Sequence, residues 1–172
     1  RVRLAHQRGA EVFISLHADA LAQGVAHGAR IFTLSDEASD AASAALAERH
    51  DRLDILSGID LNGADDVVTD VLLDLARLET APRARALAKS VLAGIENATG
   101  DLYKLPLQQA AFSVLKAADI PSILVEAGFL STDQDLDNLV DPLWRAGFIA
   151  GLRDGLAAWV ISDRAEAVLR RR

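Results

Sequence analysis

Two apolar runs in this sequence each end on a side chain that can take part in chemistry. In FISLHADA, residues 13–20, His17 is followed two positions later by Asp19, and in PSILVEAGFLS, residues 121–131, Glu126 closes the run SILV. Imidazole is a common zinc ligand, and a carboxylate can act as a general base on water. Residue types alone leave two interpretations open: a metal-assisted hydrolytic site, or a hydrogen-bonded histidine and a paired carboxylate with structural roles.

Both runs have the composition of β-strands. Residues 11–16 and 121–126 are short and rich in β-forming side chains, and residues 29–34 form a third run of this kind. Catalytic groups of α/β proteins gather where the carboxyl ends of strands open into a crevice. We therefore expect His17 and Glu126 to meet in one crevice.

Helix-forming residues dominate the rest of the chain. Pro82 is expected in the first turn of its own helix, where a proline is tolerated. A short helix is expected to begin at Asp133, loops at residues 57–64 and 101–109, and a short strand at residues 110–115. The other helices are predicted over residues 1–8, 37–56, 65–78, 82–98 and 142–161.

This order of elements predicts a single α/β domain over residues 1–172. Its expected core is a mixed β-sheet flanked by helices, with a helical insert over about residues 36–104. The chain is 51% hydrophobic and 25% charged, which indicates a globular domain with a sizeable core.

A net charge of −7 argues against general nucleic-acid binding. The absence of cysteine excludes disulfides and thiolate metal sites, and no apolar run reaches the ~18 residues of a transmembrane helix.

The amino-acid sequences of two longer segments resemble those of a known protein family. FISLHADA together with FSVLKAADIPSILVEAGFLS, residues 112–131, closely resembles the zinc-dependent N-acetylmuramoyl-L-alanine amidases, which cleave bacterial peptidoglycan during cell separation. GARIFTLSDEASDAASAALAE, residues 28–48, resembles the division-type members, which carry a helical insert here. The resemblance covers essentially the whole chain. It implies hydrolysis of the amide between N-acetylmuramic acid and L-alanine, with Zn²⁺ as cofactor and peptidoglycan as substrate.

The resemblance also implies roles for the two residues first singled out. His17 matches the zinc-binding histidine of the family's HADA motif. Glu126 matches the catalytic glutamate of the VE-x-GF motif, which in the family polarises the attacking water and stabilises the tetrahedral intermediate. Such chemistry is needed because an unactivated amide requires both an activated water and a polarised carbonyl.

Two further zinc ligands of the family have no match in this sequence. They are a histidine in a DPGHGG-like segment and a glutamate beyond it, and both would precede Arg1. The chain also lacks methionine, so we expect a fragment whose N-terminal part and any export signal are left out. We expect the full-length parent to be the enzyme, located in the periplasm or cell envelope by resemblance. The fragment alone is expected to bind zinc weakly and to be inactive.

The expected insert departs from the family pattern. LAERHDRLDILSGIDL, residues 46–61, stands where division-type members carry LAERENAADLIGGVDL, a helix that blocks the site with an acidic residue reaching the zinc. Here His50 and Asp51 replace the Glu-Asn pair, while Glu48 remains. The resemblance implies a regulatory, autoinhibitory insert, with Glu48, His50 and Asp51 as the occluding residues and an activator protein as partner. His50 is open to two interpretations, a zinc ligand or a solvated helix residue.

Two alternatives to the amidase stay open from the sequence. Because two zinc ligands are absent, the chain could be a non-catalytic remnant that binds peptidoglycan or a division-site partner. It could also be an unrelated α/β protein in which His17 and Glu126 are structural.

Overall fold

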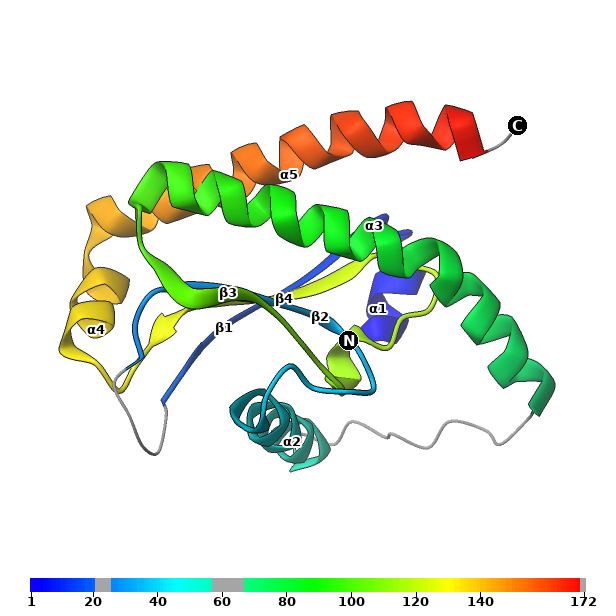
Figure 1. The fold of residues 1–172 in the computed structure, drawn as a ribbon, viewed down its shortest axis with the longest axis horizontal. Helices are drawn as coiled ribbons and strands as arrows, with labels where there is room; N and C mark the ends of the chain where they lie inside the picture. The colour runs from blue at the N-terminus through cyan, green and yellow to red at the C-terminus, as the bar shows by residue number, and fades with distance from the viewer. Residues whose placement is uncertain (21–25, 57–66, 171–172) are drawn as a thin grey trace.

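The computed structural model describes residues 1–20, 26–56 and 67–170, and the loop expected at residues 57–64 lies outside them. The predicted fold class is confirmed, because a four-stranded mixed sheet is flanked by helices (Figure 1). Within the described residues, no helix combines the length and the apolar character that a membrane span requires.

The sheet has the strand order β1-β4-β2-β3. Its strands are β1 (Phe13–Asp19), β2 (Ala29–Leu34), β3 (Leu102–Ala110) and β4 (Ser122–Phe129). β1 pairs with β4, and β2 with β3, in parallel, whereas β2 and β4 run antiparallel. All eight residues of β4 are buried, as a nearly continuous apolar run at the centre of a covered sheet predicts.

Two expectations for the segment before β4 were wrong. Residues 101–109, expected as a loop, form the edge strand β3, and the strand expected at residues 110–115 is replaced by a 3₁₀ turn, η1 (Ser113–Leu115). β3 carries Lys104 and Pro106, which are unfavourable in a central strand but tolerated at an edge. The polar composition of β3 therefore gave no strand signal in the sequence, because an edge strand pairs on one side only.

The helices cover the two faces of the sheet unequally. α3 (Val67–Thr99) and α5 (Pro142–Arg170) lie along one face, and α2 (Ala41–Leu56) lies under the other (Figure 1). The first face holds the larger core, which includes Ile31, Leu87, Val91, Ile95, Val125, Phe148 and Trp159. The second face packs Phe32, Leu46, Phe112 and Leu124. Two short helices, α1 (Val2–Gln7) and α4 (Asp133–Val140), complete the fold.

α3 is continuous through Pro82, although two helices, over residues 65–78 and 82–98, were expected. A proline inside a helix removes one backbone donor and costs about 3 kcal/mol when nothing compensates. Here the turn before it is anchored, because the Thr80 hydroxyl donates to the carbonyl oxygen of Ala118 at 2.6 Å. Beyond the proline, Leu87 is fully buried against the sheet. Tertiary packing on both sides of Pro82 thus overrides its helix-breaking tendency.

α3 and α5 approach each other so closely that their backbones touch. A Cβ atom added to Gly151 would lie 2.5 Å from the carbonyl oxygen of Gly94, and one added to Gly155 would lie 2.5 Å from that of Ser90. The Ser90 hydroxyl donates to the Gly155 carbonyl at 2.7 Å across this contact. The crossing therefore requires glycine on α5.

Gly151→Ala should destabilise the fold by at least about 2 kcal/mol, because the new methyl group meets a backbone oxygen that cannot move aside cheaply. Gly147→Ala on the same helix is the matched control, since its Cβ would meet only the Ala98 carbonyl oxygen at 3.8 Å. The control should be neutral or stabilising by up to about 1 kcal/mol. Urea unfolding followed by circular dichroism measures both, and equal midpoints for the two variants would contradict the close crossing.

Candidate functional site

Three charged or ionisable residues lie in one row across the sheet. In the strand register, Glu126 of β4 is opposite His17 of β1 on one side and Arg30 of β2 on the other. Paired residues of neighbouring strands point to the same face, so all three side chains face the α2 side. The structure therefore brings the two sequence-predicted residues together, although both sit within their strands rather than after them.

Glu126 is fully buried at the centre of this row. Its Oε1 accepts a hydrogen bond from the main-chain N–H of Asp19 at 2.6 Å, whereas Oε2 has no hydrogen-bond partner within the part of the chain that the structure describes. Burial raises the pKa of Glu126 to about 7, reinforced by the negative charge of Asp19 and opposed by Arg30. A carboxyl group with such a pKa can accept and return a proton near neutral pH.

Arg30 is the one member of the row that the sequence analysis missed. Its guanidinium lies 4.7 Å from the ring centroids of both Phe32 and Phe129, and Nη1 donates to Gln108 Oε1 at 3.2 Å. Only 2% of the residue is exposed. Burial lowers the pKa of Arg30, but the charge of Glu126 opposes this shift. The available signal was a single cation inside the otherwise uncharged strand ARIFTL.

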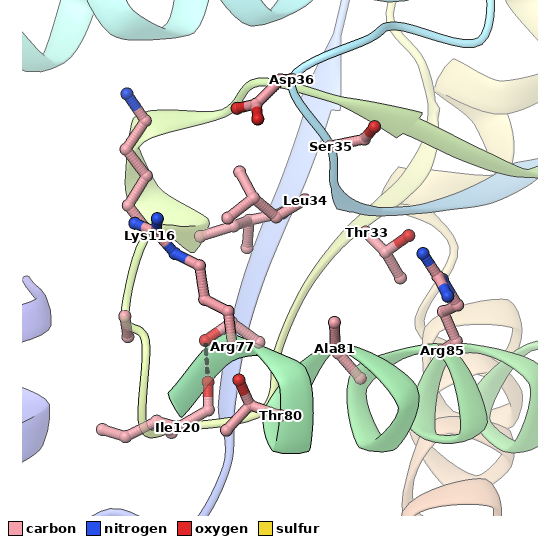
Figure 2. A pocket seen from close by; sticks show the side chains of 14 residues that line it. Thr33, Leu34, Ser35, Asp36, Arg77, Thr80, Ala81, Arg85, Lys116 and Ile120 are labelled. Atoms are coloured by element: carbon pink, nitrogen blue, oxygen red, sulfur yellow. Dashed lines mark hydrogen bonds between the residues drawn. The ribbon is translucent and has the colours of Figure 1, made fainter. Parts of the chain in front are cut away.

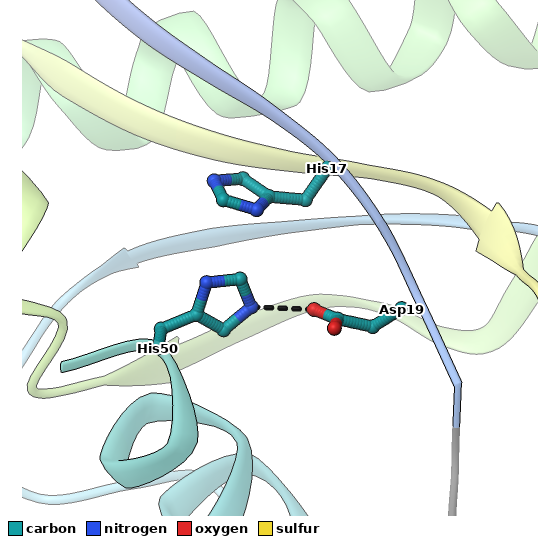
Figure 3. A group of neighbouring side chains, drawn as sticks. All are labelled: His17, Asp19 and His50. Carbon is teal, nitrogen blue, oxygen red and sulfur yellow. Dashed lines mark hydrogen bonds and ion pairs between the residues drawn. The ribbon is translucent and has the colours of Figure 1, made fainter. Parts of the chain in front are cut away.

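His17 of this row also belongs to a second group, because His17, Asp19 and His50 bring potential metal-binding atoms within 4.8 Å of one another. Figure 3 shows His50 of α2 reaching toward the two residues of β1. Its Nε2 lies 2.5 Å from Asp19 Oδ2, and its ring centroid lies 4.3 Å from that of His17, with the rings nearly perpendicular. The Ser15 hydroxyl lies 2.7 Å from His17 Nε2. This set of nitrogen and carboxylate donors matches the preferences of zinc.

Asp19 connects the metal-binding group with α2. Burial alone would raise the pKa of Asp19, but the hydrogen bond with His50 and the positive charge of Arg49 lower it overall. Arg49 Nη2 lies 2.5 Å from Asp19 Oδ1, and Nη1 donates to the Ala20 carbonyl at 2.7 Å. Asp19 therefore holds α2 through its side chain and Glu126 through its main-chain N–H.

The three residues expected to occlude the site take different positions on α2. His50 lies over the cluster and is only 7% exposed, so the interpretation as a solvated helix residue was wrong. Asp51 Oδ1 accepts from the main-chain N–H of Ser113 at 2.9 Å, which ties the helix to η1. Glu48 instead forms an exposed ion pair with Arg52 on the outer side of the helix.

A separate cavity of about 310 Å³ lies by the end of β2 and the start of β4. Figure 2 shows Arg77 and Arg85 of α3 and Lys116 around it. None of His17, His50 and Glu126 lines it, so it is distinct from the group described above.

Comparison with known proteins assigns the chain to a family. A family model described as N-acetylmuramoyl-L-alanine amidase matches residues 1–158. The N-acetylmuramoyl-L-alanine amidase AmiA of Salmonella typhimurium is 33% identical over 160 residues, which are 92% of this chain and 55% of that protein. AmiC of Neisseria meningitidis is 32% identical over 161 residues, 93% of this chain and 38% of that protein. The chain thus spans about half the length, or less, of these curated relatives.

Solved structures give the same fold. The amidase Ami1 of Mycobacterium smegmatis matches with a TM-score of 0.61 at 17% identity, covering 94% of this chain and 59% of that one. AmiC2 of Nostoc punctiforme matches with the same TM-score and identity, covering 93% and 63%. With the family match over residues 1–158, these findings show that the chain belongs to the N-acetylmuramoyl-L-alanine amidase family.

Proposed function

We propose that this chain carries part of the catalytic centre of a zinc-dependent amidase that hydrolyses the bond between N-acetylmuramic acid and L-alanine in peptidoglycan. The observation that supports this most is the juxtaposition of a buried carboxyl group, Glu126, with the donors of His17, Asp19 and His50. Family membership supplies the reaction class and the substrate class.

His17 would hold the zinc ion, and the neighbouring Asp19 and His50 make the surrounding donor set compatible with it. When bound, zinc polarises an amide carbonyl and lowers the pKa of water, which makes water nucleophilic at neutral pH. The Ser15 hydroxyl at His17 Nε2 restricts the orientation of the imidazole, as the outer hydrogen bonds of metal-binding histidines do.

Glu126 would act as the general base and then as the general acid. Its Oε1 is held by the Asp19 N–H, so the carboxyl group has a fixed direction. Oε2 can take the proton from the attacking water and return it to the leaving amine of L-alanine. Arg30, opposite Glu126 in the register, provides the buried positive charge that offsets the ionised carboxylate.

We propose further that α2 autoinhibits the enzyme by covering this face of the sheet. Arg49 and His50 contact Asp19 of the site, and Asp51 holds the helix at η1. An activator protein would relieve the block by displacing α2, which belongs to the helical insert proposed at about residues 36–104. A role in cell separation and a location in the periplasm or cell envelope fit this substrate.

Glu126→Gln in the full-length protein should retain zinc and lose at least ~100-fold in kcat, because the amide cannot exchange the proton. Zinc content is measured by elemental analysis, and hydrolysis by release of stem peptide from purified peptidoglycan. Glu96→Gln, an exposed position on α3, is the matched control and should hydrolyse normally. Retained turnover in Glu126→Gln would refute the assignment. A wild-type protein that binds peptidoglycan without cleaving it would favour the non-catalytic alternative.

Arg49→Ala should raise peptidoglycan hydrolysis by the full-length protein several-fold when no activator protein is present. The change removes the ion pair with Asp19 and the bond to the Ala20 carbonyl, and a half-exposed pair of this kind contributes on the order of 1 kcal/mol to docking of α2. Arg52→Ala on the same helix is the control, because Arg52 pairs only outward with Glu48 among the described contacts. Equal basal rates for the two variants would count against an autoinhibitory α2.

A further inference from the structure

We propose that the cavity of about 310 Å³ by the end of β2 and the start of β4 is a second binding site, which takes a small organic anion. The ligand class is a molecule with a carboxylate or phosphate group and an apolar portion beside it. The cavity is remote from the proposed base, because Ser122 in its lining precedes Glu126 by about 13 Å along β4. Binding there is therefore independent of the proposed hydrolysis.

The cavity owes its shape to one face of α3. The residues of this helix that line it have the spacing i, i+3, i+4, i+7 and i+8, which places them along a single face. Short side chains occupy the middle of this face and leave room for a ligand. Arginines occupy its two ends, about 12 Å apart along the helix axis. In chain order these residues are Arg77, Thr80, Ala81, Ala84 and Arg85.

Positive charges outnumber negative ones around the cavity. Figure 2 shows Arg77 and Lys116 on one side of it and Arg85 on the other. Among the described residues that line it, Asp36 is the one acidic side chain. In the same part of the chain, neither Arg85 nor Lys116 forms an ion pair. The whole chain carries a net charge of −7, so this local excess of cations opposes the overall charge and favours an anion.

Thr33 adds a buried hydroxyl group on the side of the cavity formed by the sheet. Only 3% of the residue is exposed. Its oxygen accepts from Gln109 Nε2 at 3.4 Å, and within the described residues its own proton has no acceptor, so it can donate to a ligand oxygen. The hydroxyls of Thr80 and Ser122, by contrast, already donate to main-chain carbonyl oxygens and therefore hold the wall in place.

The remaining lining is mostly aliphatic, and this sets the ligand class. Cavities that bind small organic molecules combine an apolar lining with a few placed polar groups, and their volumes begin at about 300 Å³. Guanidinium groups suit carboxylate and phosphate oxygens because their N–H donors form a planar fork. An organic anion satisfies both parts of the lining, whereas an inorganic ion leaves the aliphatic part uncovered. The aliphatic residues are Leu34, Ala81, Ala84, Leu115, Ala117 and Ile120.

Two other hollows in the described part of the molecule lack this charge balance. In the hollow of about 350 Å³ along α3 and α5, Asp154 is the one charged residue of the described lining. A hollow of about 160 Å³ by Trp159 contains Arg83, but Asp163 already holds that guanidinium with two hydrogen bonds of 2.9 Å. Neither hollow therefore presents a cation that is available to an incoming anion.

The first test measures binding of two probes, glutarate and inorganic phosphate, to the full-length protein by isothermal titration calorimetry. Glutarate should bind more tightly than phosphate, because its methylene groups cover the aliphatic wall. Arg85→Ala and Lys116→Ala change exposed positions, and together they should weaken glutarate binding at least ~10-fold. Lys89→Ala is the matched control and should bind as the wild type does, since Lys89 is an exposed cation of α3 outside the cavity.

A further variant tests the space instead of the charge. Ala81→Leu fills the cavity with a helix-favouring side chain and keeps all three cations, so it should also weaken glutarate binding at least ~10-fold. Circular dichroism checks that each variant is folded. The site is refuted if the double charge variant and Ala81→Leu bind glutarate normally, or if Lys89→Ala weakens binding equally. It is also refuted if neither probe binds at up to ~10 mM. Binding of phosphate alone would refute the organic ligand class.

Two sources can supply such an anion, and kinetics separates them. If the ligand is a carboxylate of a peptidoglycan stem peptide, the double variant of Arg85 and Lys116 should raise KM for peptidoglycan at unchanged kcat. If the ligand is a free metabolite, both constants should stay unchanged while the wild-type protein still binds glutarate. Either result supports the site. A wild-type protein that binds glutarate in this cavity without hydrolysing peptidoglycan would refute the proposed function and leave the site intact.

Discussion

The structure depends on one costly feature, the burial of the Glu126 carboxyl group in the central strand of the sheet. An ionised carboxylate loses its hydration there, and this loss is the main reason that its pKa rises to about 7. Two neighbours limit the cost: the Asp19 N–H donates to Oε1 from β1, and Arg30 supplies an opposite charge from β2. The strand order β1-β4-β2 is what places both neighbours beside Glu126. The topology of the sheet is therefore inseparable from the chemistry of the site.

Asp19 connects the proposed general base with the helix that is proposed to occlude the site. Its main chain orients Glu126, and its carboxylate holds Arg49 and His50 of α2. Undocking of α2 would remove both partners of the carboxylate and admit water to the face of the sheet that carries Glu126. Asp19 thus connects the helix with the proposed base, and a second connection runs from Ser43 of α2 through Gln108 to Arg30.

The sequence predicted the parts of the site that depend on local pattern. His17 and Glu126 stood out because each ends or interrupts an apolar run, and the α/β class followed from the alternation of such runs with helix formers. The rest depends on tertiary context. β3 was missed because an edge strand tolerates Lys104 and Pro106, and α3 was divided because Pro82 is compensated by packing that the local sequence does not encode. The position of Arg30 beside Glu126 and the burial of His50 followed only from knowing which strand and which helix lie beside Glu126.

The two faces of the sheet also differ in how their helices are attached, and this difference distinguishes α2 from α3 within the proposed helical insert. The second half of α3 buries Leu87, Val91 and Ile95 and touches the backbone of α5, so it cannot leave without unfolding the core. Among the side chains of α2 that the structure describes, residues 41–52, the buried apolar ones are Leu46 and Ala47. The helix is also held by polar contacts of Ser43 and of residues 49–51. Because the C-terminal half of α3 is part of the core, the regulation proposed for residues 36–104 is expected to act on α2.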